Sequence, residues 1–177
     1  MARVFLSLGS NWGDRAFCLK RALERLEALQ STTLSRVSGL YETEPWGETE
    51  GEEPFLNLVA EIETTIPPLR LLALLQKIEE DLGRRRPARL DPFTYGPRTI
   101  DIDILLYGEL VMSDSDRLQI PHLHMHERRF VLLPLAEIAP DVEHPTLYRS
   151  IRELLDEVED TKEVTLIQTA QGRLAKG

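Results

Sequence analysis

Phe55-Leu56-Asn57-Leu58-Val59-Ala60-Glu61-Ile62-Glu63 has the clearest strand pattern in the chain. Its even positions are all aliphatic and alternate with a mixed set at the odd positions, which is the two-residue period of a β-strand with one buried face. The odd positions include an aromatic ring, an amide and carboxylates. We therefore expect a sheet whose aliphatic face packs on helices, while its other face is open to a ligand.

The segments on either side of this strand predict its neighbours. Pro67 and Pro68 open a predicted helix, since proline is tolerated in a first turn, and Gly83 is a plausible stop. The apolar stripe of this helix is Leu71, Leu75, Ile78 and Leu82. On the other side, an extended stretch from about 33 to 43 is followed by a loop over 44–54 that glycine and proline interrupt.

The remaining periodic segments complete the order of elements. We predict a strand over 3–8, a helix from 14 to about 30 and a strand over 99–106. The order β-α-β-β-α-β predicts an α+β, ferredoxin-like fold: an antiparallel sheet with two helices on one face. Beyond it we expect C-terminal helices over about 127–138 and 148–159, and a short strand over 164–168.

Composition places the chain among soluble globular proteins. It has 177 residues and a formal net charge of -9, which argues against a basic nucleic-acid-binding surface. No apolar run is long enough for a membrane helix, and the N-terminus has no signal-peptide pattern. Cys18 is the single cysteine, so no intramolecular disulfide is possible. We expect a cytoplasmic protein with no membrane partner, and a monomer.

Charge is unevenly distributed along the chain. Residues 42–53 contain six glutamates and no basic residue, whereas residues 84–98 contain five arginines and one aspartate. Guanidinium groups bind phosphate and carboxylate in a bidentate manner. The arginine segment indicates a site for a small anion, although a solvated loop that pairs with the glutamates would give the same pattern.

Asp101 and Asp103 lie two residues apart on the last predicted strand and therefore share a face. Two aspartates on one face repel each other, and a divalent cation would relieve that repulsion. Mg²⁺ is held by one or two carboxylates plus substrate phosphates, and arginines then stabilise the transferring group. The alternative is a solvated polar face, which is common in antiparallel sheets.

Two further groups of side chains each fit more than one role. His122, His124 and His126 fit a metal site, a single contact to substrate or an ordinary surface, and the arginines that follow disfavour a cation. Asn57 carries donors and an acceptor that suit the amide-like edge of a heterocycle. Nearby aromatic side chains suit stacking on a flat ring or satellite core packing. They are Trp46, Phe55, Tyr95 and Phe130.

A set of motifs together resembles one family. Tyr95-Gly96-Pro97-Arg98-Thr99-Ile100-Asp101-Ile102-Asp103-Ile104 is similar to the signature of the 6-hydroxymethyl-7,8-dihydropterin pyrophosphokinases. The other matching segments follow in the family's order over about residues 3–140. They are Leu8-Gly9-Ser10-Asn11, Tyr41 to Gly47, Phe55-Leu56-Asn57, Gly83 to Arg86, and Ile120-Pro121-His122 with Arg128 and Phe130.

The resemblance implies transfer of the β,γ-pyrophosphoryl group of ATP to the pterin hydroxyl, with two Mg²⁺ ions held by Asp101 and Asp103. We expect a single such domain over 1–160, followed by a C-terminal strand and tail over 161–177 that is partly disordered. The implied pterin contacts are Thr43, Trp46, Phe55, Asn57, Tyr95 and Phe130. The implied catalytic and ATP contacts are Glu79, Arg84, Arg86, Arg98, Ile104, Arg117, His122 and Arg128.

Two other functions are alternatives to pyrophosphoryl transfer. A two-metal nucleotidyltransferase places Gly-Ser close to its Asp-x-Asp, whereas here the two motifs are about ninety residues apart. A non-catalytic ferredoxin-like module that binds a ligand or RNA would explain the fold, since this architecture has many functions. It would not explain two aspartates on the ligand face.

Overall fold

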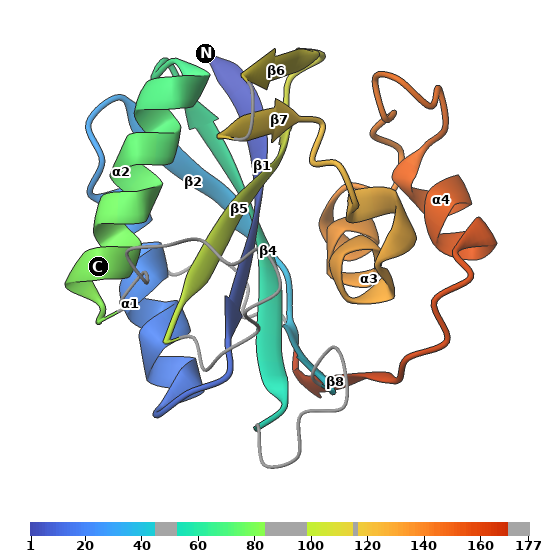
Figure 1. Ribbon diagram of the computed structural model, residues 1–177, viewed down its shortest axis with the longest axis horizontal. Helices are drawn as coiled ribbons and strands as arrows, with labels where there is room; N and C mark the ends of the chain where they lie inside the picture. The colour runs from blue at the N-terminus through green and yellow to red at the C-terminus, as the bar shows by residue number, and fades with distance from the viewer. Residues whose placement is uncertain (45–52, 84–98, 115–116, 170–177) are drawn as a thin grey trace.

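The computed structural model describes residues 1–44, 53–83, 99–114 and 117–169. An antiparallel sheet runs through the centre in the order β5-β1-β4-β3-β8, and β2 also pairs with β4 (Figure 1). Without β8, this is the strand order of the ferredoxin-like fold, so the predicted α+β class is confirmed. The strands of this sheet are β1 (Ala2–Ser10), β2 (Thr32–Val37), β3 (Leu40–Thr43), β4 (Phe55–Thr64), β5 (Asp101–Tyr107) and β8 (Val164–Gln168).

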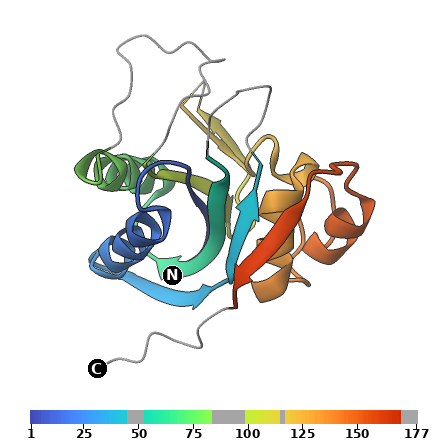
Figure 2. The ribbon, with the colours of Figure 1, turned by 90° about the horizontal axis from the view of Figure 1, so that it is seen from below.

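Helices α1 (Arg15–Glu27) and α2 (Pro68–Asp81) cover one face of the sheet (Figure 2). The Asp14 side chain accepts a hydrogen bond from the N–H of Phe17 and so caps α1, while α2 begins at Pro68 without a side-chain cap. The alternating aliphatic residues of β1, β4 and β5 pack with the helix stripes into one buried cluster. The predicted helix-facing side of each strand is confirmed.

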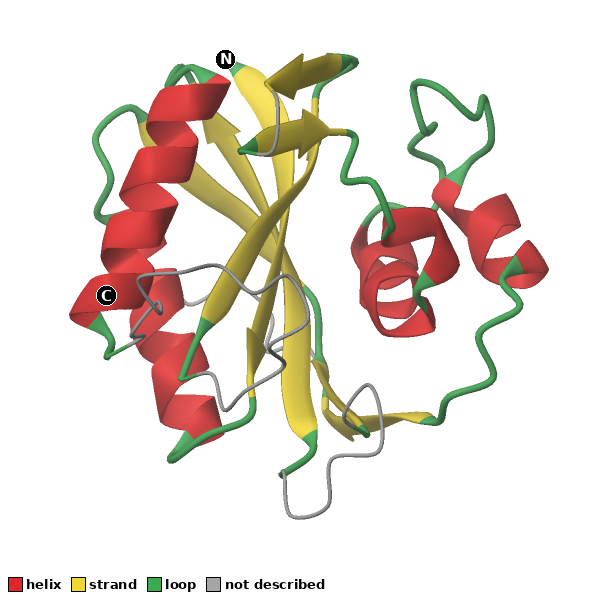
Figure 3. Cartoon of the chain, in the orientation of Figure 1, coloured by secondary structure: helices red, strands yellow, loops and turns green. Residues whose placement is uncertain are grey.

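The other face is not open along its whole length, which corrects the sequence-based expectation. Helices α3 (Arg129–Ile138) and α4 (Ile151–Glu157) lie on this side, opposite α1 and α2 (Figure 3). Phe5, Val59 and Leu105 project from the sheet into a second buried cluster with these helices. Among the described residues, these helices leave the part of the face near the C-terminal end of β1 and the start of β5 for a ligand.

Local differences from the predicted elements have identifiable causes. The extended stretch before the loop divides into β2 and β3 at Ser38 and Gly39, where the Ser38 hydroxyl accepts a hydrogen bond from the N–H of Val59. A two-stranded ribbon, β6 (Met112–Asp114) with β7 (Leu118–Ile120), was not predicted because three-residue strands show little periodicity. The last helix begins only at Ile151, since Tyr148 has a left-handed backbone with φ of 54°.

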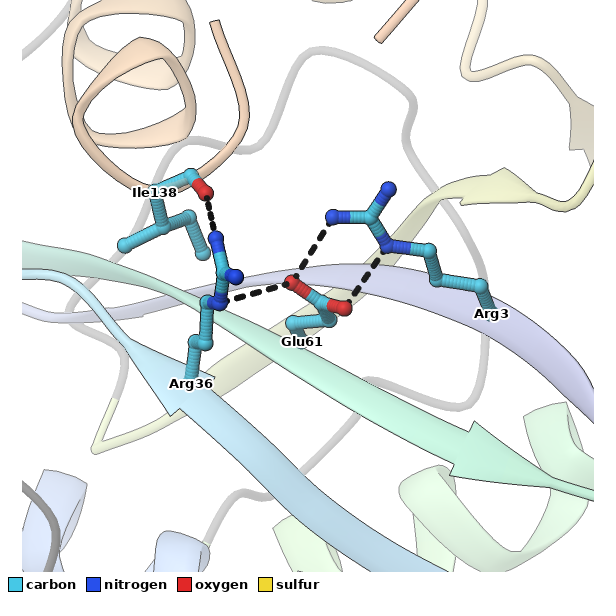
Figure 4. A network of polar contacts seen from close by, with 4 residues as sticks. All are labelled: Arg3, Arg36, Glu61 and Ile138. Atoms are coloured by element: carbon cyan, nitrogen blue, oxygen red, sulfur yellow. Dashed lines mark hydrogen bonds and ion pairs between the residues drawn. The ribbon is translucent and has the colours of Figure 1, made fainter.

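A buried carboxylate ties α3 to the sheet (Figure 4). Glu61 of β4 is 5% exposed, and Arg3 of β1 reaches it with Nε at 2.7 Å from Oε1 and Nη2 at 3.2 Å from Oε2. Arg36 of β2 lies 3.9 Å from the same carboxylate and donates from Nη1 to the carbonyl oxygen of Ile138 at 2.8 Å. The network therefore satisfies a carbonyl at the end of α3.

We predict that Glu61→Ala lowers the free energy of unfolding by about 1–2 kcal/mol, because it removes the buried carboxylate that holds the partly exposed guanidinium groups of Arg3 and Arg36. Urea denaturation monitored by circular dichroism measures this change. As a control, Lys77→Ala removes the exposed pair of Lys77 with Asp81 and should change stability little. Equal effects of the two substitutions would contradict the role given to Glu61.

Candidate active site

Four residues form a row across the sheet on the uncovered part of its face. Gly9 of β1 pairs with Asp101 of β5 on one side and with Asn57 of β4 on the other. Asn57 in turn pairs with Tyr41 of β3. Adjacent strands lie about 4.8 Å apart, so the backbones of Asp101 and Asn57 are separated by roughly 10 Å. Gly9 adds no side chain of its own between these two residues, and we call the strip of sheet at Gly9, between Asp101 and Asn57, the trough.

Gly9 is required by the position of the Asn57 side chain. A Cβ atom on Gly9 would lie 2.8 Å from Oδ1 of Asn57 and 3.6 Å from Cδ1 of Phe55. Asn57 is 3% exposed, and its Nδ2 donates to Oγ1 of Thr43 at 2.8 Å. The amide is thus held over Gly9 by Thr43, with Phe55 beside it. Three of the predicted pterin contacts, Thr43, Phe55 and Asn57, lie together.

Asp101 and Asp103 project on the same face as Gly9, as predicted, because β5 alternates between half-buried aspartates and buried isoleucines. Asp103 pairs with Ser7, one row below Gly9 and Asp101. Two carboxylates at this spacing offer the hard oxygen ligands that Mg²⁺ prefers, with phosphate oxygens completing the coordination. Among the described residues there is no cluster of three or more metal-ligating side chains. A pair of carboxylates is a donor set that fits a cation whose other ligands come from a substrate.

Glu79 and Ile104 lie on the helix side of β5 rather than on the aspartate face. Glu79 of α2 is 1% exposed, and its Oε1 accepts a hydrogen bond of 2.7 Å from the N–H of Ile102. This bond holds the backbone between Asp101 and Asp103. Ile104 is 3% exposed within the core beneath α1 and α2. The side chains of both residues thus stand behind the aspartates, on the opposite face of the strand.

His122 lies against β5, because its N–H donates to the carbonyl oxygen of Leu105 at 2.9 Å. Its Nδ1 accepts the N–H of His124 at 3.2 Å, which leaves the proton of the neutral ring on Nε2. Burial, and then the charge of Arg128, lowers the pKa of His122 to about 4. At neutral pH His122 is therefore an uncharged hydrogen-bond donor.

Arg128 and Phe130 lie together at the beginning of α3. The Arg128 guanidinium is 5.9 Å from the centre of the Phe130 ring, and both residues are half-buried. Arg117 lies farther out, after the β6 strand, where its Nη2 pairs with Asp114 at 2.8 Å. The remaining predicted site residues fall outside the described residues. They are Trp46, Arg84, Arg86, Tyr95 and Arg98.

The three histidines do not form a common metal site in this part of the chain. The rings of His122 and His124 lie 6.5 Å apart, and His126 instead packs edge-on against His144 at 6.1 Å. A turn and a short 3₁₀ helix, Met125–Glu127, replace the extended backbone that would have placed all three on one face. Of the three, His122 alone lies against β5.

Comparison with known proteins identifies the family. The 7,8-dihydro-6-hydroxymethylpterin-pyrophosphokinase (HPPK) model matches residues 5–140. A 2-amino-4-hydroxy-6-hydroxymethyldihydropteridine pyrophosphokinase from Bacillus subtilis (strain 168) is 45% identical over 140 residues, which cover 79% of this chain and 80% of that protein. One from Pseudomonas aeruginosa is 45% identical over 143 residues, or 81% and 84% of the two chains. The chain belongs to the HPPK family.

Solved structures agree on the fold of this HPPK family member. The crystal structure of Plasmodium falciparum HPPK-DHPS, wild type with SDX-DHP, superposes with a TM-score of 0.66 over 88% of this chain, at 19% sequence identity. This chain spans 43% of that one, less than half of its length. Within the described ranges, none of the helices has the length and apolarity needed to cross a bilayer.

Two residues of this row, Gly9 and Tyr41, were not among the predicted site residues. The strand predicted over 3–8 ended before Gly9, although Gly9 continues the alternation of Phe5 and Ser7 on the ligand face of β1. Tyr41 was part of a matching motif without a role, and strand pairing places it directly opposite Asn57. The positions of both residues follow from how the strands pair, and the two-residue period of a single strand does not reveal that pairing.

The described part of the chain encloses a hollow of about 870 Å³ on another part of the molecule. It lies between α1 and the bend that joins β2 to β3. Phe17 and Lys20 line it from α1, and Leu34 and Leu40 line it from the strands. None of the predicted site residues borders this hollow, so it is separate from the trough over Gly9.

We predict that His122 titrates with a midpoint near pH 4 in the ligand-free protein, which a proton NMR titration of its ring measures. Because the folded pKa lies below the ordinary value of 6.5, the unfolded chain binds the extra proton first. Stability is then fully present above about pH 6.5 and falls toward pH 4. His122→Gln should weaken this dependence of the melting temperature on pH. A ring midpoint near 6.5 would contradict the assignment.

Proposed function

We propose that the chain transfers the β,γ-pyrophosphoryl group of ATP to the hydroxyl of 6-hydroxymethyl-7,8-dihydropterin, giving AMP and the pterin diphosphate in folate biosynthesis. Membership of the HPPK family supports the reaction. The single structural observation that supports it is the row Asp101–Gly9–Asn57, in which a pair of carboxylates and a side-chain amide lie on opposite sides of Gly9.

The trough suggests how the pterin lies. Its amide-like edge pairs with the Asn57 side chain, and its ring lies over Gly9 with the hydroxymethyl group toward Asp101. Phe130 at the start of α3 covers one side of the ring, and Tyr95 is proposed for the other. Thr43 and Trp46 contribute contacts at the Asn57 end. A flat ring needs the strip at Gly9 to remain without a side chain.

On the phosphate side, Asp101 and Asp103 would hold two Mg²⁺ ions, which would supply positive charge to the phosphate groups of ATP. The hydroxymethyl oxygen attacks the β-phosphorus and releases its proton to solvent water. The bond from that phosphorus to the oxygen shared with the α-phosphate breaks, and the electron pair leaves with AMP. Positioning and charge neutralisation account for most of the acceleration of such transfers.

The remaining proposed contacts serve ATP. Neutral His122 donates from Nε2 to a phosphate oxygen, while Arg128 and Arg117 add positive charge, and the Glu79 and Ile104 segments adjoin the nucleotide. Arg84, Arg86 and Arg98 are proposed to stabilise the transferring group, as guanidiniums do in phosphoryl transfer. We place this reaction in the cytoplasm, with a monomer that acts on two small substrates and binds neither nucleic acid nor membranes.

A coupled assay for AMP tests the reaction. With ATP and Mg²⁺, AMP should form only when the pterin is present, and EDTA should abolish it. ADP in place of AMP would contradict transfer of pyrophosphate. No nucleotide turnover by folded protein would favour the non-catalytic binding module.

We predict that Asp101→Ala and Asp103→Ala each abolish turnover in that assay while the protein stays folded, because one carboxylate alone no longer anchors the metal–nucleotide complex. Asp141→Ala, which removes an exposed partner of Arg152, is the matched control and should keep full activity. Near wild-type kcat of either site variant at saturating Mg²⁺ would refute the metal assignment.

We also predict that Asn57→Ala weakens pterin binding more than ATP binding, and that Gly9→Ala reproduces this pattern. The added methyl group forces the Asn57 amide out of place, at a cost of about tenfold in pterin affinity, the value of one good hydrogen bond. Isothermal titration calorimetry with each ligand measures both affinities. Equal losses for pterin and ATP would contradict a role confined to the pterin.

A further inference from the structure

The row across the sheet continues beyond Asn57 to a buried tyrosine. Tyr41 of β3 is 7% exposed and stands directly opposite Asn57. Side chains of directly opposed residues contact one another across a sheet. Tyr41 and Thr43 share a face of β3, so Asn57 has one of them opposite and the other, its hydrogen-bond acceptor, one step along the strand.

The Tyr41 hydroxyl does not point into solvent but to helix α3. It donates to Oε2 of Glu137 at 2.5 Å. Burial, and then the hydrogen bond to Glu137, raises the pKa of Tyr41 well above its usual range, so the hydroxyl is a donor at any physiological pH. A short hydrogen bond to a carboxylate is among the stronger side-chain contacts in proteins.

Glu137 holds a second part of β3 with the same carboxylate. Both of its oxygens lie 3.1 Å from the backbone nitrogen of Gly39, a buried residue at the bend where β2 ends and β3 begins. A buried N–H without a partner would be costly, so this contact also fixes the bend. Glu137 thereby connects α3 to the start of β3 and to the side chain opposite Asn57.

Helix α3 carries the other wall of the proposed pterin site. Phe130 lies seven residues before Glu137, about two helical turns or 10 Å along the axis. The buried side of α3, including Val131 and Leu135, packs on Val59 of β4 and makes the helix a rigid connection. The separation between the Phe130 ring and the Asn57 amide therefore depends on how α3 is joined to β3.

We propose that Glu137, acting through Tyr41, is a positioning residue for the pterin: it sets the Asn57 amide and the Phe130 ring at the separation that the bound ring requires. This role rests on the proposed pterin pyrophosphokinase function. Glu137 itself lies too far along α3 to touch the substrate, and its effect passes through the Tyr41–Asn57 pair and through the helix.

The test compares steady-state constants of Glu137→Ala, Glu137→Gln and Tyr41→Phe with those of the wild type. We expect Glu137→Ala to raise the KM for the pterin about tenfold, the loss expected for one charge-assisted hydrogen bond, while the KM for ATP changes less than about twofold. Glu137→Gln keeps one acceptor oxygen at the same reach and should restore most of the pterin KM.

Arg36→Ala is the matched control, because Arg36 also joins the end of α3 to the sheet, through the Ile138 carbonyl, but does not contact Tyr41. We expect it to lower the melting temperature without raising the pterin KM. In an Asn57→Ala background, Glu137→Ala should have less than half of its effect in the wild type, since the amide it positions is gone.

An unchanged pterin KM in Glu137→Ala, or equal increases in Glu137→Ala and Arg36→Ala, would overturn the proposal and leave the reaction in place. Full additivity of Glu137→Ala with Asn57→Ala would overturn the route through Tyr41. Failure of the proposed function is a separate result, because it would appear as a wild-type protein that forms no AMP with the pterin.

Discussion

The site depends on one constraint, the register of β1 between β4 and β5. Gly9 faces Asn57 on one side and Asp101 on the other only while both pairings hold. A slip by one residue would turn Gly9 to the helix face and carry Leu8 into the trough. The burial of Val4, Leu6 and Leu8 beneath α1 and α2 prevents that slip. The same alternation that builds the core therefore places Ser7 and Gly9, rather than large side chains, on the ligand face at the C-terminal end of β1.

The extent of the site depends on how much of the sheet face helix α3 covers. Helix α3 packs on Val59, and Asn57, two residues earlier on β4, lies beside Gly9. Two polar connections hold the helix there, one from Arg36 to the carbonyl of Ile138 and one from Glu137 to β3. Polar contacts of this kind add direction to apolar packing, which alone tolerates small shifts. The Glu137 connection reaches the strand residue opposite Asn57 and so orients the binding wall, whereas the Arg36 connection adds stability.

Sequence patterns predicted the main helices and strands but not the contacts between them. The alternation at Leu56–Ile62 and the helical stripe from Leu71 predicted the strand, the helix and the face that carries Asn57 and the two aspartates. The bend at Gly39 was missed because its N–H is satisfied by Glu137, 98 residues away. The coverage of Val59 by α3 was missed because an amphipathic helix does not specify the surface on which it packs. The role of Gly9 needed the register of two strand pairs.

The most direct test of this account is a crystal structure with the pterin, Mn²⁺ in place of Mg²⁺, and an ATP analogue whose α–β bridging oxygen is replaced by methylene. We predict anomalous scattering from manganese between Asp101 and Asp103, and the pterin ring over Gly9 with its edge at Asn57. A pterin bound instead in the hollow between α1 and the β2–β3 bend, or manganese bound away from the aspartates, would contradict the account.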